Sequence, residues 1–150
     1  MFQKLIATRE DLVALVLRLT LGIVIFPHGA QKVLGWFGGY GFAGTMGYFQ
    51  SQGIPYVFGV LAIAAEFLGS LGLIAGLLTR VAAFGIASVM VVAVALYHGS
   101  AGFFMNWNGT AKGEGFEYHL LAIGIALALM IRGGGTASAD GALAAHVPEP

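Results

Sequence analysis

The sequence of 150 residues contains no cysteine, only four prolines and very few charged side chains. Without cysteine, the chain cannot form disulfides, thiolate nucleophiles, iron–sulfur clusters or cysteine-ligated zinc sites. Charged residues make up 9% of the chain, whereas an average soluble domain carries about 25%. Seven basic and seven acidic side chains give a net charge of +0, so the chain lacks the basic surplus that a nucleic-acid partner requires.

Apolar side chains take the place of the missing charges. Hydrophobic residues make up 58% of the sequence, and the mean hydropathy is +0.86. A chain with so few ionic groups cannot cover its surface in water, so its outer face is expected to contact the lipid bilayer. The length fits one domain. The composition therefore predicts an integral membrane protein and excludes a soluble enzyme.

Four continuous apolar segments follow one another, at residues 12–26, 56–78, 81–97 and 120–131. Their hydrophobic residues do not alternate with polar ones, which favours helices over strands. A bilayer core about 30 Å thick needs about 20 helical residues, so the three shorter segments must extend into the polar residues at their outer ends. We predict an all-α fold, an integral membrane four-helix bundle over residues 1–132, followed by a flexible C-terminal tail over residues 133–150.

The first long loop, residues 35–55, contains a helical pattern of its own. Phe42, Met46 and Phe49 are spaced so that they share one face of a helix. A helix with one apolar face beside a membrane span is typical of an interfacial helix. We therefore predict a short helix that lies on the membrane surface in this outer loop.

The basic residues predict the orientation of the chain. With four spans, both termini lie on the same side as the short loop between the second and third segments. That side carries four basic residues and the other carries two, namely Lys4, Arg9, Arg80 and Arg132 against Lys32 and Lys112. Basic residues are retained in the cytoplasm, so both termini are expected there.

Two ionisable residues lie deep inside the apolar segments. Arg18 interrupts the first segment and Glu66 the second. Charged groups inside a bilayer are costly and usually pair or serve a function. We predict that Arg18 and Glu66 form a buried ion pair, which either sets the register of the two helices or lines a polar pocket.

Three histidines are predicted at a similar depth on three different helices. His28, His98 and His119 lie roughly 20–27 Å from the inner ends of their segments at 1.5 Å per residue. Other polar side chains accompany them, namely Gln31, Lys32 and Glu117. Histidine exchanges protons near neutral pH and hydrogen-bonds carbonyl oxygens. This group predicts a pocket for a quinone head group. Two of the histidines as haem ligands are a less favoured alternative, and no metal motif is present.

Several motifs resemble the DoxX family of small bacterial and archaeal membrane proteins with four helices. The resemblance rests on the sequence PHGAQK at residues 27–32, the sequence GWFGG at residues 35–39, and Glu66 followed by glycines up to the sequence GLLTR at residues 76–80. It implies a location in the cell (inner) membrane and a link to respiratory or redox-defence oxidoreduction. By position, the motif residues of the family correspond to His28, Gln31, Lys32, Glu66 and Arg80.

Two functional hypotheses follow. The first is a membrane subunit of a respiratory or redox-defence oxidoreductase assembly that binds a quinone or similar lipophile through His28, Gln31, Lys32, Glu66, His98, Glu117 and His119. The alternative is a non-enzymatic scaffold whose polar residues serve only packing. Either hypothesis implies further protein subunits or a homo-oligomer as partners. A solute carrier is disfavoured, because the chain lacks matched broken helices in two inverted halves.

Overall fold

The computed structural model describes residues 2–146, which fold almost entirely into helices. In chain order, the helices are α1 (Phe2–Ile6), α2 (Leu12–Leu34), η1 (Trp36–Gly38), α3 (Gly41–Ser51), α4 (Tyr56–Ala75), α5 (Thr79–Ala93), η2 (Val94–His98), η3 (Gly99–Ala101), α6 (Glu117–Arg132) and α7 (Ala139–Ala144). The described residues contain no strand. The expected all-α class is therefore confirmed.

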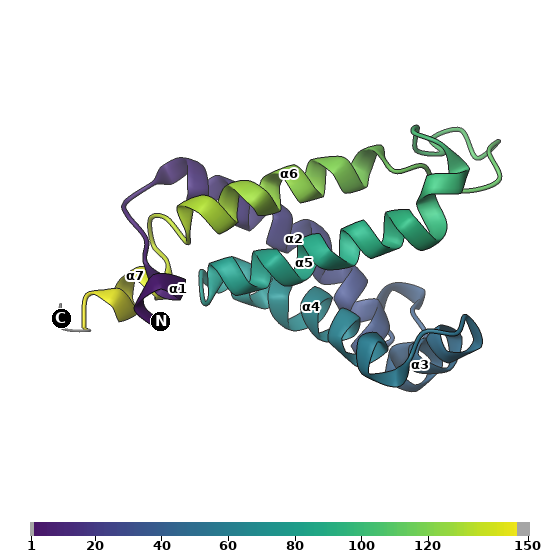
Figure 1. The fold of residues 1–150 in the computed structure, drawn as a ribbon, viewed down its shortest axis with the longest axis horizontal. Helices are drawn as coiled ribbons and strands as arrows, with labels where there is room; N and C mark the ends of the chain where they lie inside the picture. Colours follow the sequence, from purple (N-terminus) through teal and green to yellow (C-terminus); the bar gives the residue numbers. More distant parts are fainter. Residues whose placement is uncertain (1, 147–150) are drawn as a thin grey trace.

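The four long helices α2, α4, α5 and α6 form a closed bundle (Figure 1). Helix α2 packs against α4 and α6, and α5 completes the ring by packing against the same two helices. Each helix contributes a fully buried aliphatic side chain to the centre, and these are Ile25, Leu73, Ile86 and Leu129. The bundle therefore has one continuous apolar core, as the hydropathy pattern predicts.

The outside of the bundle is as apolar as its centre. Ile131, Leu121 and Leu12 each expose more than two thirds of their side chains, at 78%, 71% and 68%. Three helical stretches, Leu12–Leu34, Tyr56–Ala75 and Thr79–Ala101, are long and apolar enough to cross a membrane. The fourth helix, α6, has 16 residues and is about 24 Å long. An apolar exterior of this extent is stable in lipid but not in water, so the structure is that of a membrane bundle.

The two ends of the bundle differ. Both termini, α1, α7 and the turn between α4 and α5 lie at one end, which we call the terminal end (Figure 1). Helix α3 and the loop at residues 102–116 lie at the opposite end, the loop end. The helix expected in the first long loop is present as α3. Its Met46 and Phe49 pack against Gly59 of α4.

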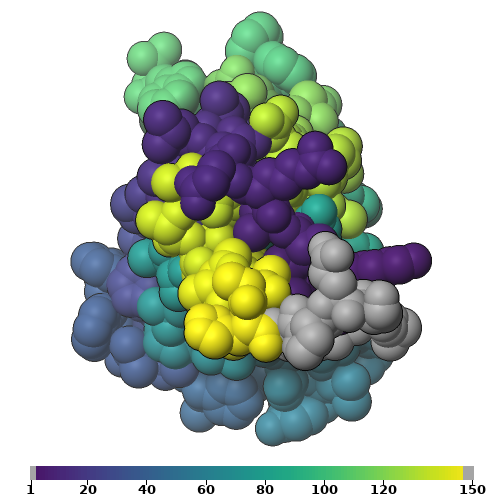
Figure 2. All heavy atoms as spheres, turned by 90° about the vertical axis from the view of Figure 1, so that its left-hand side faces the viewer, coloured from purple at the N-terminus to yellow at the C-terminus, as the bar shows by residue number. Residues whose placement is uncertain are grey.

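The C-terminal segment departs from the prediction of a flexible tail. Residues 133–146 pack against the terminal end, where α1 and α7 cover much of the surface (Figure 2). The carboxylate of Asp140 accepts hydrogen bonds from the amides of Leu78 at 2.7 Å and Thr79 at 2.9 Å, and so satisfies the first amides of α5. The prediction is wrong for these residues because their small polar side chains resemble a linker in composition. Their backbone carbonyls and one carboxylate nevertheless form hydrogen bonds with the bundle. Residues 147–150 lie outside the described part of the chain.

Candidate functional site

A buried ion pair joins α2 to α4 near the loop end. The Nζ atom of Lys32 lies 2.5 Å from Oε2 of Glu66, and Glu66 is only 5% exposed. The two helices approach closely here because Gly29 has no side chain. A Cβ atom at Gly29 would lie 2.6 Å from the Cα atom of Phe67. Gly29 thus allows the contact that brings the ammonium and carboxylate groups together.

The expected ion pair between Arg18 and Glu66 is wrong. The guanidinium group of Arg18 donates instead to backbone carbonyls, two of them at the end of α4 and three in the C-terminal segment. Side chains on a helix lean toward its N-terminus. Arg18 therefore points to the terminal end, away from Glu66, while Lys32 at the loop end leans back toward the carboxylate.

Two histidine rings lie in contact, tilted against each other by 40°, between α6 and the end of the third span. The ring centroids of His98 and His119 are 4.1 Å apart. His98 ends η2, a π-helical turn, and such turns re-aim side chains within longer helices. The Nδ1 atom of His98 lies 2.8 Å from the carbonyl oxygen of Glu114. Since a carbonyl only accepts, Nδ1 carries the proton in this contact, and Nε2 of the neutral ring is left as an acceptor.

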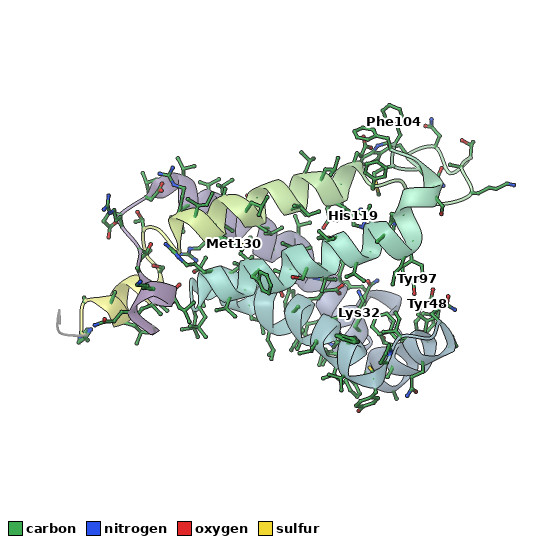
Figure 3. The ribbon with its side chains drawn as sticks, in the orientation of Figure 1. Lys32, Tyr48, Tyr97, Phe104, His119 and Met130 are labelled. Atoms are coloured by element: carbon green, nitrogen blue, oxygen red, sulfur yellow. The ribbon has the colours of Figure 1, made fainter. Side chains whose placement is uncertain are left out.

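Tyr118 lies between two of the histidines. Its ring centroid is 5.5 Å from that of His119 and 6.5 Å from that of His28. The buried hydroxyl of Tyr118 and the buried Nδ1 atom of His119 have no hydrogen-bond partner among residues 2–146. We call this group the loop-end cluster, which consists of His28, Lys32, Glu66, His98, Tyr118 and His119. Lys32 and His119 are labelled in Figure 3.

Comparison with known proteins assigns the chain to a family. The model of the DoxX family matches residues 13–99, more than half of the sequence. The chain belongs to the DoxX family. The match includes all of α2 after its first residue, α4, α5 and η2, and so carries four of the six residues of the loop-end cluster.

Two known proteins from other organisms are similar to this DoxX-family chain. The "Inner membrane protein YqjF" of Escherichia coli (strain K12) is 33% identical over 89 residues, which cover 59% of this chain and 64% of YqjF. The "Putative oxidoreductase CatD" of Bacillus subtilis (strain 168) is 32% identical over 115 residues, which cover 77% of this chain and 76% of CatD. The chain thus spans slightly less than two thirds of YqjF. No solved structure matches.

The remaining predicted site residues lie outside the loop-end cluster and hold neighbouring segments. The side chain of Gln31 donates to the carbonyl of Phe37 at 3.2 Å and fixes η1. The Oε1 atom of Glu117 accepts from the amide of Met105 at 2.9 Å and from the indole of Trp107 at 3.2 Å, and so anchors the loop at residues 102–116.

The last DoxX motif residue, Arg80, lies at the opposite end of the bundle. One of its terminal nitrogens donates to the carbonyl of Ile131 at 3.1 Å, which ties the start of α5 to the end of α6. The DoxX motif therefore divides in two. His28, Lys32 and Glu66 belong to the loop-end cluster, whereas Gln31 and Arg80 support the backbone elsewhere.

The donor set of the cluster bears on the cofactors considered from sequence. Among residues 2–146, no three His, Asp or Glu side chains are grouped to hold a metal ion. Two imidazoles on opposite sides of an iron, each with a metal–nitrogen bond of about 2.0 Å, would have ring centroids well beyond 5 Å apart. The ring centroids of His98 and His119, 4.1 Å apart, are too close to fit a haem between them.

Sequence reasoning missed Tyr118. An aromatic residue near the end of a span is usually an interface anchor, and its type alone gives no reason to place it in a site. One signal could have found Tyr118. It directly precedes His119, in the stretch into which the fourth apolar segment had to extend. The structure adds the decisive fact, which is that the Tyr118 hydroxyl is buried without a hydrogen-bond partner within residues 2–146.

Proposed function

We propose that this DoxX-family protein is the membrane subunit of a respiratory or redox-defence oxidoreductase assembly. In this proposal, the loop-end cluster binds the head group of a quinone or a similar lipophile. Support comes from the family, from the name of the similar CatD protein, a putative oxidoreductase, and from polar groups gathered within an apolar bundle. Further protein subunits, or other copies of the chain, are expected as partners in the bilayer.

The observation that carries the proposal is the pair of unsatisfied polar atoms in the cluster. The hydroxyl of Tyr118 and Nδ1 of His119 are both buried, and neither has a hydrogen-bond partner in the part of the chain that the structure describes. A buried polar group without a hydrogen bond costs about 1–3 kcal/mol. A ligand with carbonyl or hydroxyl oxygens would satisfy both atoms, and a quinone head group carries two such oxygens on an apolar ring that suits the bundle interior.

The charges of the cluster suit the reduction of a bound quinone. Conversion of a quinone to a quinol consumes two electrons and two protons. The cluster contains groups that donate protons or stabilise a developing negative charge, among them His28, Lys32 and His119. The chain has no cysteine and hence no thiol–disulfide couple to supply electrons. In this proposal, a redox partner subunit supplies them.

The proposed orientation gives the cluster a place in the membrane. Both termini lie at the end of the bundle opposite the cluster (Figure 1). If the basic residues keep the terminal end in the cytoplasm, the cluster lies in the outer leaflet of the cell membrane. Cysteine labelling of single-cysteine variants at the terminal end, from inside or outside the cell, tests this orientation directly because the natural chain has no cysteine.

Replacement of Tyr118 by Phe is the sharpest test of the proposed pocket. The protein is purified in mild detergent, and bound quinone is measured after lipid extraction. Loss of one ligand hydrogen bond of about 0.5–1.5 kcal/mol predicts roughly two- to twelvefold weaker binding. The stability of the variant should not fall, because the hydroxyl has no hydrogen-bond partner among the described residues.

Controls separate this proposal from the scaffold alternative. His146→Ala changes an exposed histidine far from the cluster and should leave quinone occupancy unchanged. If the wild-type protein carries no quinone and takes up none from quinone-loaded micelles, the pocket is refuted and the scaffold is favoured.

A further inference from the structure

Two sides of the bundle are closed to the bilayer at the depth of the loop-end cluster. Between α2 and α4, a Cβ atom at Gly29 would lie 2.6 Å from the Cα atom of Phe67. Between α4 and α5, a Cβ atom at Gly85 would lie 3.2 Å from the Cβ atom of Ala65, the residue directly before Glu66. Helices that approach so closely leave no room for a molecule to pass between them.

The third side and the loop end offer no apolar passage either. The rings of His98 and His119 are in contact, at 4.1 Å between centroids, and join η2 to α6. His98 also lines an open hollow of about 320 Å³ at the loop end, together with Lys112 and Glu114. Both of these charged side chains are exposed, so the hollow belongs to the polar surface of the protein. A lipophile would have to leave the membrane to use it.

The fourth side, between α2 and α6, is different. The ion pair of Arg132 with Asp11 joins the two helices at the terminal end, and from there they diverge toward the loop end (Figure 1). Near the loop end, the ring centroids of His28 on α2 and Tyr118 on α6 are 6.5 Å apart. His28 is exposed, and its imidazole forms no hydrogen bond with another residue of the described chain.

This imidazole lies at a depth where a missing hydrogen bond is costly. His28 precedes Leu34, the last residue of α2, by six positions, which is about 9 Å. Helix α2 is about 35 Å long and the bilayer core about 30 Å thick, so most of that distance lies in hydrocarbon. Helical side chains lean toward the N-terminus, so the imidazole points away from the nearer membrane surface. A hydrogen-bond partner is therefore expected from a molecule within the membrane.

Apolar side chains continue the same side of the bundle deeper in the bilayer. Val24 lies one turn before His28 on α2, and Leu121 lies one turn after Tyr118 on α6. Both are exposed, at 42% and 71%. This side thus has polar groups near the membrane surface and an apolar surface below them. An amphiphile with a small polar head group and an apolar tail is divided in the same way.

The charges beside this opening favour an uncharged head group. Lys32 and Glu66 form an ion pair, so neither is free as a counter-ion for a charged ligand. A charged group at this depth in the bilayer is costly unless it is paired. Neutral oxygens that exchange hydrogen bonds with an imidazole and a phenol carry no such cost.

We infer that the loop-end cluster opens sideways into the bilayer between α2 and α6, and that its ligand is an uncharged amphiphile that enters by this route. The head group binds between His28 and Tyr118, and the tail lies along Val24 and Leu121. This inference rests on the proposed function. It adds the route of entry and the charge of the ligand to it.

Tryptophan fluorescence can locate the ligand. In the full chain carrying Trp36→Phe and Trp107→Phe, one reporter is introduced at a time. Val24→Trp and Leu121→Trp lie on the proposed route, and Ile23→Trp is the control, which is 59% exposed on another face of α2. Each protein is reconstituted in phosphatidylcholine vesicles and titrated with decylbenzoquinone, which quenches indole fluorescence on contact. Quenching of both route reporters should saturate and be at least twice that of the control.

Further arms separate the route from the site. His28→Ala in the Val24→Trp protein should raise the half-saturating quinone content about two- to twelvefold, as expected for one lost hydrogen bond. A charged, water-soluble benzoquinone sulfonate, added on both sides of the vesicles, should quench neither route reporter. Equal, non-saturating quenching at all three positions, or quenching by the sulfonate, would overturn the inference. If Tyr118→Phe loses bound quinone while the route reporters behave like the control, the proposed quinone site stands and only the route is refuted.

Discussion

Replacement of Arg18 by Met tests how the terminal end is held together. Arg18 is 2% exposed. Its guanidinium group donates to the carbonyls of Leu73 and Ile74 at 3.1 and 2.6 Å. It also donates to the carbonyls of Gly134 at 2.8 Å and of Thr136 and Ala137 at 3.2 and 2.7 Å. One side chain thus joins α2, the end of α4 and the C-terminal segment. Met keeps the apolar stem of Arg18 but removes every donor.

The expected loss of stability follows from these contacts. Each hydrogen bond from a charged donor contributes about 1.5–3 kcal/mol when considered alone. Such contributions do not add fully, and burial of a charged group costs several kcal/mol, which offsets part of the gain. Removal of the charged partner from a buried polar network usually costs about 3–5 kcal/mol. We expect Arg18→Met to lose about this amount.

The assay is unfolding in mixed micelles of mild detergent and dodecyl sulfate, followed by tryptophan fluorescence. Trp36 and Trp107 are the two tryptophans of the chain and lie at the loop end, so they report the loss of the whole bundle. Arg9→Met is the control, since Arg9 is exposed, and a change within about 0.5 kcal/mol is expected there. Arg18→Lys should be intermediate, because three donors on one nitrogen cannot reach five separated carbonyls. Equal stability of Arg18→Met and Arg9→Met would refute this reasoning.

Three further predictions use the same unfolding assay. Gly29→Ala should lower the free energy of unfolding by about 1–3 kcal/mol through overpacking against the backbone of α4. Gly47→Ala is the control and should not change it, because a Cβ there has nothing within 4 Å. Equal effects of the two substitutions would contradict the close contact at Gly29. Asp140→Ala should lose about 1–2 kcal/mol, because it removes the cap of α5, and should make the C-terminal segment more sensitive to proteases. The hydrogen bond from Arg132 lowers the pKa of Asp11 below its usual 3.8. The stabilisation from the ionised Asp11 carboxylate should therefore be complete above about pH 4 and be lost as the pH falls through the lowered pKa. Asp11→Asn should abolish this acid dependence.

Hydropathy alone was enough to predict the four long helices of the bundle. The apolar runs are long, continuous and nearly free of charge, and in lipid a chain can satisfy its backbone only within helices or closed barrels. The expected extension of the short runs into polar residues at their outer ends is present in the structure. Helix α6 begins at Glu117, and the first span continues to Leu34. Length and depth along the bundle axis are properties that a sequence contains directly.

Side-chain pairs between helices could not be predicted in this way, because the depth of a residue along the bundle does not fix the direction in which its side chain points. Counting residues put Arg18 and Glu66 within reach of each other, yet the lean of helical side chains toward the N-terminus sends Arg18 to the terminal end. The same lean brings Lys32 down to Glu66. The roles of Gln31 and Glu117 follow from loop backbones that no spacing rule places.

The sequence by itself determined a membrane bundle of four helices, and it determined that three histidines lie near one end, since both results depend only on hydropathy and on distance along an axis. The tertiary structure alone decided which of these groups meet. It placed Tyr118 in the cluster and paired Glu66 with Lys32. It also enclosed the guanidinium group of Arg18 with the C-terminal segment, whose composition resembles a linker. These outcomes depend on how the helices are rotated and on how closely Gly29 lets two of them approach, and that information becomes available only once the helices pack.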